Sequence, residues 1–107
     1  MRRKMSKKIS VIIKEPGKKP RHVYISNTLN NLQKTVGGYI ETVTLSSDCV
    51  AICNEESRLQ RLPWCCNIFG VDFAGTVILA GIDGDEFADI PATFEQVKRL
   101  FPGLWEG

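Results

Sequence analysis

The segment YIETVTLSSDCVAIC, residues 39–53, decides the fold that this sequence predicts. Its first part, residues 39–45, is rich in β-branched residues, and its last part, residues 49–53, is an almost unbroken apolar run. Both parts favour extended backbone, whereas the short polar residues 46–48 between them favour a tight turn. The segment therefore predicts a β-hairpin.

Another hairpin is predicted on the amino-terminal side of this segment. Residues 9–13 are almost all apolar, and residues 22–25 place Val23 and Ile25 on one face of a strand. The segment EPGKKP, residues 15–20, lies between these two runs. Proline fixes φ and glycine accepts positive φ, so this segment predicts the turn that joins the two strands.

A short helix is predicted between the two hairpins. The polar residues 26–28 offer side-chain oxygens that can accept the free amides of a first helical turn. Leu29, Leu32 and Val36 then recur at the spacing of one helix face. The pair Gly37–Gly38 follows, and glycine tolerates the left-handed conformation that often ends a helix.

Further elements are predicted downstream: a short helix or irregular segment at 58–67, strands at 68–73 and 75–82, an acidic loop at 83–86 and a final helix that starts at Thr93 and stops before Pro102. Strands that come as adjacent hairpins do not spell the strand–helix–strand alternation of a parallel sheet. The sequence thus predicts an α+β fold. We expect a mostly antiparallel sheet built from hairpins, with one short helix after the first hairpin and a C-terminal helix, both on one side.

The charge is unevenly distributed along the chain. The first 21 residues hold nine Lys or Arg against one Glu, which is +8, and the other 86 hold five basic and eleven acidic residues, which is −6. We expect residues 1–8 to be a basic flexible arm and residues 9–107 to be a single domain. The arm residues that could contact a polyanion are Arg2, Arg3, Lys4, Lys7 and Lys8.

Several classes of protein are not favoured by the sequence. No apolar run approaches the roughly 18 residues of a membrane span, and the basic start is followed by too short an apolar stretch for a signal peptide. We therefore expect no membrane partner, and a location in the cytoplasm of a bacterial host cell, where thiols stay reduced.

The cysteines allow two interpretations. Cys49, Cys53, Cys65 and Cys66 could supply the four thiolates of a zinc site. However, Cys49 and Cys53 would lie some 13 Å apart along a strand, because each residue rises about 3.3 Å. Free cysteine also behaves as a small buried apolar residue. No other cofactor is predicted.

Two longer runs, LQKTVGGYIETV at residues 32–43 and CNEESRLQRLP at residues 53–63, carry a resemblance to a known family. They resemble the domain of unknown function 3846 family, found in phages, plasmids and conjugative elements of bacteria, over about residues 9–82. The motif residues of unassigned role are Gly37, Gly38, Tyr39, Glu41, Asn54, Glu55 and Glu56. The sequence departs from the family pattern at Ser57, where glycine is common, and in LPWCCN, residues 62–67.

The resemblance implies a mobile-element context, and it implies no mechanism. We expect a non-catalytic protein that binds a host protein such as a defence nuclease, in the manner of an anti-CRISPR or anti-restriction inhibitor. The alternative is a nucleic-acid-binding accessory protein that uses the basic arm. An enzyme that uses Glu55, Glu56 or a thiol is a third reading, without positive support beyond the motif.

Overall fold

A computed structural model describes residues 8–105 of the chain. In that part the strands are β1 (Lys8–Lys14), β2 (Arg21–Ser26), β3 (Ile40–Ser46), β4 (Cys49–Asn54), β5 (Trp64–Ile68), β6 (Val71–Ala74), β7 (Val77–Asp83) and β8 (Glu86–Ala88). The helices are α1 (Leu29–Val36), α2 (Phe94–Leu100) and the short 3-10 helix η1 (Pro102–Trp105). The expected arm lies outside the described residues except for Lys8, which is the first residue of β1.

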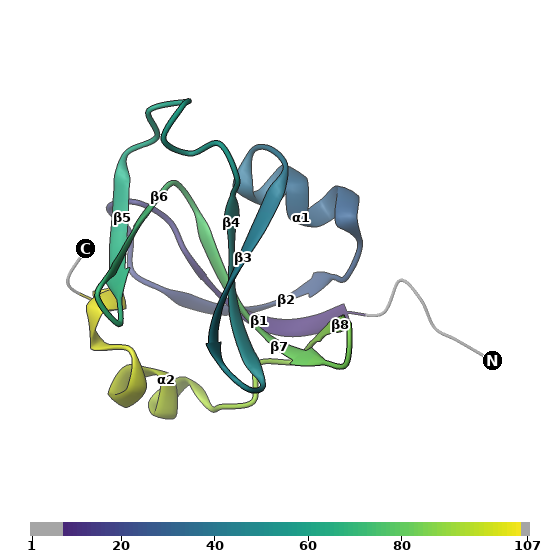
Figure 1. The fold of residues 1–107 in the computed structure, drawn as a ribbon. Coiled ribbons are helices and arrows are strands. Elements are labelled where there is room, and N and C mark those ends of the chain that lie inside the picture. The colour runs from purple at the N-terminus through teal and green to yellow at the C-terminus, as the bar shows by residue number, and fades with distance from the viewer. Residues whose placement is uncertain (1–7, 106–107) are drawn as a thin grey trace.

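The main sheet is antiparallel and has the order β2-β1-β7-β4-β3, with β8 paired to the end of β7 (Figure 1). Its outer pairs are the two predicted hairpins, β1–β2 and β3–β4, and both are confirmed. Between them lies β7, where Leu79 is opposite Ile12 of β1 and Ala51 of β4. A central strand is buried on both faces, which explains the continuous apolar run in β7. The predicted α+β class is confirmed.

The sheet is covered on both faces. One face carries Val11, Val50 and Ile78, and α1 packs there through Leu32 and Val36. The other face packs against α2, η1 and the β5–β6 hairpin. This cluster contains the sheet residues Ile12, Ala51 and Leu79 and the covering residues Phe73, Val97, Phe101 and Leu104. The expectation that both helices lie on one side is wrong, because strands that are apolar on both faces need cover on both.

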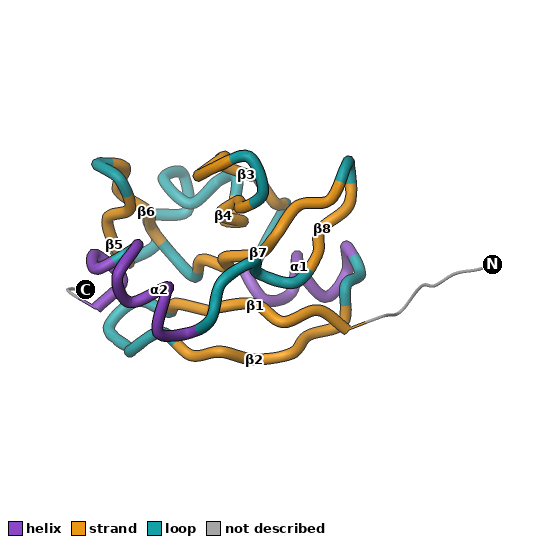
Figure 2. The backbone as a smooth tube through the Cα atoms, turned by 90° about the horizontal axis from the view of Figure 1, so that it is seen from below, coloured by secondary structure: helices purple, strands orange, loops and turns teal. Residues whose placement is uncertain are grey.

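The β5–β6 hairpin forms a second, two-stranded sheet. The β5–β6 hairpin and α2 lie toward one end of the molecule, whereas β8 lies toward the other (Figure 2).

The predicted strand at residues 68–73 is wrong, because Phe69 and Gly70 form a turn with φ values of 52° and 84°. The Asn67 side chain accepts a hydrogen bond from the Gly70 amide at 3.0 Å. The strand β8 was not predicted from the sequence.

Helix ends follow the sequence closely. Thr28 caps α1 by accepting a hydrogen bond from the Asn31 amide at 3.1 Å, and Gly37 ends α1 with φ 84°. In α2, Thr93 and Gln96 form a reciprocal capping box. Within residues 8–105, no helix is long and apolar enough to cross a membrane.

Candidate binding groove

A groove of about 450 Å³ lies between the β3–β4 hairpin and the β5–β6 hairpin. Its lining comes from β3, β4 and β6, from Trp64 of β5, and from the loop between β4 and β5, which contributes residues 55–59 and Leu62. We call this hollow the β3–β6 groove. Its floor includes the buried side chains of Cys53 and Phe73. The groove is therefore built on the side of the sheet opposite α1.

Acidic side chains dominate the charge of the β3–β6 groove. It is lined by the carboxylates of Glu41, Glu55, Glu56 and Asp72 and by one cation, Arg58, which gives one minus four, or −3. In the described part of the chain, none of the ion pairs within 4.0 Å involves any of these five groups. The groove thus presents negative charge that the described residues do not neutralise by direct pairing.

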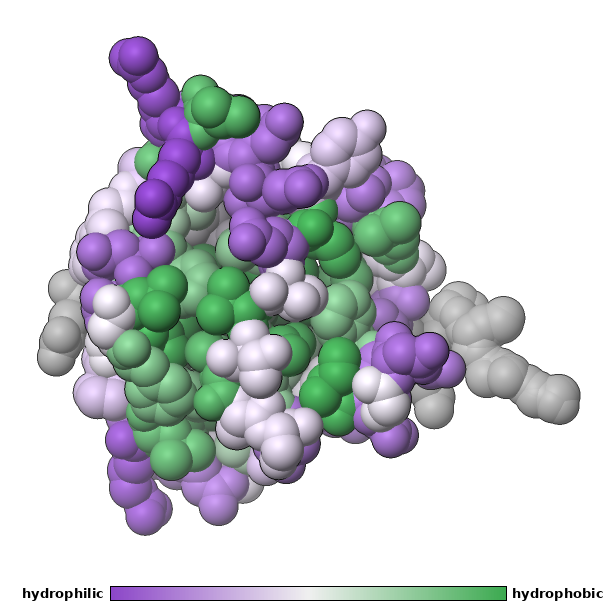
Figure 3. All heavy atoms as spheres, in the orientation of Figure 1, coloured by the Kyte–Doolittle hydropathy of each residue, from purple (hydrophilic) through white to green (hydrophobic). Residues whose placement is uncertain are grey.

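Apolar side chains lie among these charges. Leu59 is 82 % exposed, Trp64 is 50 % exposed and Val71 is 44 % exposed, and all three line the groove. Figure 3 shows apolar side chains gathered on this face of the molecule, with hydrophilic side chains toward the loop at its top. The rim therefore combines large exposed apolar surface with carboxylates.

The two sequence motifs meet at one buried side chain, Asn54. Its amide nitrogen donates to the Val36 carbonyl oxygen and to Gln60 Oε1, both at 3.2 Å. Its amide oxygen accepts from the Glu56 backbone amide at 2.7 Å. Asn54 therefore links the end of α1 to the loop that carries Glu55 and Glu56, and it fixes the position of the Glu56 backbone.

Gly38 supplies the room that Asn54 needs. A β-carbon at position 38 would come within 2.9 Å of the Asn54 amide nitrogen. Tyr39 extends the same junction, because its carbonyl oxygen accepts from the Glu55 amide at 2.8 Å while its ring is exposed. The motif thus divides into Gly37, Gly38, Tyr39 and Asn54, which shape the junction, and Glu41, Glu55 and Glu56, which line the groove.

Asp72 is held by two neighbours on the β5–β6 hairpin. Its Oδ1 accepts hydrogen bonds from Trp64 Nε1 and from Asn67 Nδ2, each at 3.0 Å. Both donors stabilise the ionised form, and together with the charge of Arg58 they lower the pKa of Asp72. The indole of Trp64 is thereby tied to a carboxylate at the groove wall.

The cysteines do not form the four-thiolate site that the sequence left open. Among residues 8–105, no group of three or more His, Cys, Asp or Glu side chains lies close enough to hold a metal ion. Cys49 and Cys53 are separated along the extended β4, and burial raises the pKa of each thiol to about 11. Cys65 and Cys66 are adjacent in β5, next to a shift in pairing register.

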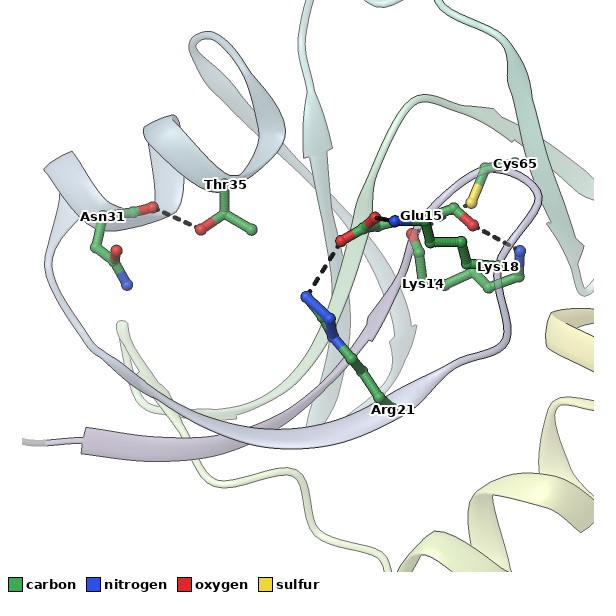
Figure 4. A network of polar contacts seen from close by, with 7 residues as sticks. All are labelled: Lys14, Glu15, Lys18, Arg21, Asn31, Thr35 and Cys65. Atoms are coloured by element: carbon green, nitrogen blue, oxygen red, sulfur yellow. Dashed lines mark hydrogen bonds and ion pairs between the residues drawn. The ribbon is translucent and has the colours of Figure 1, made fainter.

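Both thiols of this adjacent pair are fully buried. A hydrogen bond to Cys65, together with burial, raises the pKa of Cys66. Cys65 Sγ donates to the carbonyl oxygen of Lys14 at 3.3 Å. Figure 4 shows this contact, which fastens the end of β1 to β5. The cysteines therefore contribute to the core between the sheet and the β5–β6 hairpin.

The basic residues near the first turn are partly paired. Glu15 accepts from Lys18 at 3.2 Å and from Arg21 at 3.1 Å (Figure 4). Lys14 is 1 % exposed, and its Nζ donates to the Glu15 carbonyl oxygen at 2.9 Å. Of the residues expected to contact a polyanion, Arg2, Arg3, Lys4 and Lys7 lie outside the described residues, and Lys8 is exposed at the start of β1.

Sequence reasoning missed much of the groove. None of Leu59, Trp64, Val71 and Asp72 was predicted as a site residue. The strand β6 that carries Val71 and Asp72 depends on the turn at Phe69–Gly70. The signal that could have revealed it is the Asn67 side chain three residues before a glycine, because asparagine readily accepts hydrogen bonds in turns.

Comparison with known proteins bears out the resemblance seen in the sequence. The family model described as "Domain of unknown function (DUF3846)" matches residues 8–102. No curated protein and no solved structure matches the chain.

Proposed function

The chain belongs to the DUF3846 family of domains of unknown function, and from that premise we propose that it is a non-catalytic protein-binding protein of a phage or another mobile element. Its β3–β6 groove is the interface, and the partner is a host defence protein such as a restriction or CRISPR nuclease. Binding covers a surface that the partner needs, so the protein acts as an inhibitor.

The observation that carries this proposal is the exposed apolar rim of the groove. Binding energy at protein interfaces is concentrated in a few central side chains, among which Trp is enriched, and a polar rim surrounds them. Trp64, with Leu59 and Val71 beside it, supplies the apolar part, and the carboxylates supply the polar surround. Exposed apolar surface rimmed by polar groups is typical of a protein-binding site.

The negative charge of the groove favours one kind of partner surface. Complementary charge accelerates encounter and selects against wrong partners. A nuclease binds nucleic acid through Lys and Arg side chains, so the surface that it needs for its substrate is basic. A groove with a charge of −3 is suited to cover such a surface.

The proposal is tested in bacterial cells that carry a restriction or CRISPR nuclease. Expression of the protein should raise the transformation efficiency of a plasmid that the nuclease targets. Leu59→Asp should abolish this protection, because it replaces exposed apolar surface of the rim with a hydrated carboxylate that cannot pack against the partner.

Leu100→Asp is the matched control, because Leu100 is an exposed leucine on α2 that does not line the groove. This variant should protect as well as the unchanged protein. Protection by Leu59→Asp equal to that of the unchanged protein would refute the groove as the interface. Absence of protection against every nuclease system tried would refute the inhibitor role.

A further inference from the structure

The strand β3 forms an outer edge of the main sheet. Its inner side pairs with β4, where Glu41 is opposite Cys53 and Val43 is opposite Ala51. In an antiparallel pair, directly opposed residues alternate between those that exchange backbone hydrogen bonds and those whose backbone groups point outward. One backbone hydrogen bond at the end of this pair shows which residues of β3 bond to β4 and which have their backbone groups pointing outward.

That contact is the hydrogen bond from the Glu55 amide to the Tyr39 carbonyl oxygen. It makes Tyr39–Glu55 a hydrogen-bonded pair, so the alternation assigns the same state to Glu41 and Val43. The backbone groups of Thr42 and Thr44 then point away from β4, toward the open edge. An edge of this kind can pair with another extended chain.

The β3–β6 groove lies beside this edge. Glu41 and Val43 both line it, so the residues of β3 whose backbones pair with β4 have their side chains on the groove face. Directly opposed residues of neighbouring strands have their side chains on the same face. A strand added next to β3 would therefore place every second side chain over the groove.

The charges beside the edge select the added strand. Glu41, Glu55 and Asp72 offer carboxylates at the groove, and Trp64 offers an aromatic face on which a guanidinium can stack. The opposite edge of the sheet, β2, begins instead with Arg21 and His22. The two edges of the sheet thus differ in charge, and the acidic character belongs to the β3 side.

We infer that an extended segment of a partner protein, with Arg or Lys at alternate positions, adds to the β3 edge and places its basic side chains in the β3–β6 groove. This inference rests on the proposed function, because it specifies how the groove binds a protein. Main-chain hydrogen bonds to Thr42 and Thr44 supply affinity, and the carboxylates supply the selection for basic side chains.

The test uses a fluorescent peptide of sequence RVRVRVRV and measures its affinity by anisotropy. The unchanged protein should bind it, and a peptide of sequence EVEVEVEV should bind at least about tenfold more weakly. A second basic peptide carries a methyl group on every other backbone nitrogen. It keeps its charge, but along one side of the extended peptide it has no N–H group to donate to β3. It too should bind at least about tenfold more weakly.

Two protein variants locate the site. Thr42→Pro removes an outward amide and no amide of the β3–β4 ladder, so it should fold and should weaken binding at least about tenfold. Glu41→Gln should weaken binding through the lost charge. Glu86→Gln is the matched control, because Glu86 is an exposed carboxylate on β8 that does not line the groove, and it should leave affinity unchanged.

The outcomes separate this inference from the proposed function. Equal affinity for the methylated and unmethylated basic peptides refutes strand addition without any protein variant, even if Thr42→Pro does not fold. Failure of the basic peptide to bind at about 1 mM also refutes it. If Leu59→Asp still abolishes protection in cells, these results leave the proposed function in place. If Leu59→Asp protects fully while the peptide binds as expected, the groove binds basic strands but is not the interface for inhibition, so that part of the proposed function fails instead.

Discussion

At the scale of single residues, Asn54 explains why two separate motifs belong together. It is 1 % exposed, and it contacts the end of α1, Gln60 and the Glu56 backbone. A buried amide must be hydrogen-bonded to avoid a cost of about 1–3 kcal/mol. The glycine at position 38 permits this amide to approach the backbone. Part of the motif therefore has a structural role at this junction, and the glutamates of the motif line the groove.

We predict that Gly38→Ala lowers the free energy of unfolding by about 1–3 kcal/mol, because the new β-carbon displaces the Asn54 amide. Asn54→Ala should lower it by a similar amount, because it leaves the Val36 carbonyl and the Glu56 amide without this partner. Chemical denaturation measures both. Once Asn54 is replaced, adding Gly38→Ala should cost less than it does alone. Strictly additive effects would contradict the proposed contact.

At the scale of elements, the β5–β6 hairpin decides the second wall of the groove. Its turn needs positive φ at Phe69 and Gly70, and Phe69 contacts the Phe101 ring with centroids 5.2 Å apart. Cross-strand hydrogen bonds join Trp64 and Asn67 of β5 to Asp72 of β6. The hairpin thereby holds a tryptophan and a carboxylate at fixed relative positions.

We predict that the pKa of Asp72, measured by NMR titration, lies below the usual value of an aspartate because of these two donors. Asn67→Ala should raise the pKa of Asp72, since the Asn67 hydrogen bond lowers this pKa more than the Trp64 hydrogen bond does. A pKa that is lower in the folded than in the unfolded state stabilises the fold at neutral pH, and this contribution is lost as pH falls through the folded pKa.

The acid-induced loss of stability should therefore be smaller in Asp72→Asn than in the unchanged protein, over the range below about pH 4. Urea denaturation at several pH values measures this difference. Asp85→Asn is a suitable control, because Asp85 is an exposed carboxylate at the β7–β8 turn. An Asp72 pKa at its usual value would contradict the two hydrogen bonds.

At the scale of the whole molecule, the amino-terminal segment and the groove carry opposite charges. Residues 1–7 contain Arg2, Arg3, Lys4 and Lys7 and no acidic residue. Without these residues the formal charge changes from +2 to −2, that is, ten basic against twelve acidic side chains. The groove, in contrast, has a charge of −3. A polyanion and a basic protein segment should therefore be attracted to different parts of the protein.

We predict that any binding of duplex DNA depends on the amino-terminal segment. Replacement of its four cations by Gln should weaken the affinity and should reduce the salt dependence, by up to about four in the slope of log affinity against log salt. Fluorescence anisotropy over a range of salt concentrations measures both. Glu41→Gln should change neither. An unchanged slope in the neutralised variant would contradict a role for the segment in DNA binding.

The local elements that could be predicted from sequence are those fixed by neighbouring residues. The two outer hairpins, the Gly37 end of α1 and the capping box at Thr93 follow from side-chain spacing and from backbone torsions that only certain residues adopt. The family also follows, because its motif is a contiguous pattern. The segment after residue 57 was predicted less well, since its strands depend on core contacts of Cys66 and Phe73.

The sequence by itself thus determined the α+β class, the outer hairpins, the helix ends and the acidic residues Glu41, Glu55 and Glu56. Only the tertiary structure decided that Leu59, Trp64 and Asp72 line the same groove as those residues, and that the four cysteines are spread through the core instead of converging as metal ligands. The physical reason is the separation along the sequence between the residues that interact. A turn or a cap forms between residues a few positions apart, whereas a groove forms where distant elements cover the two apolar faces of one sheet.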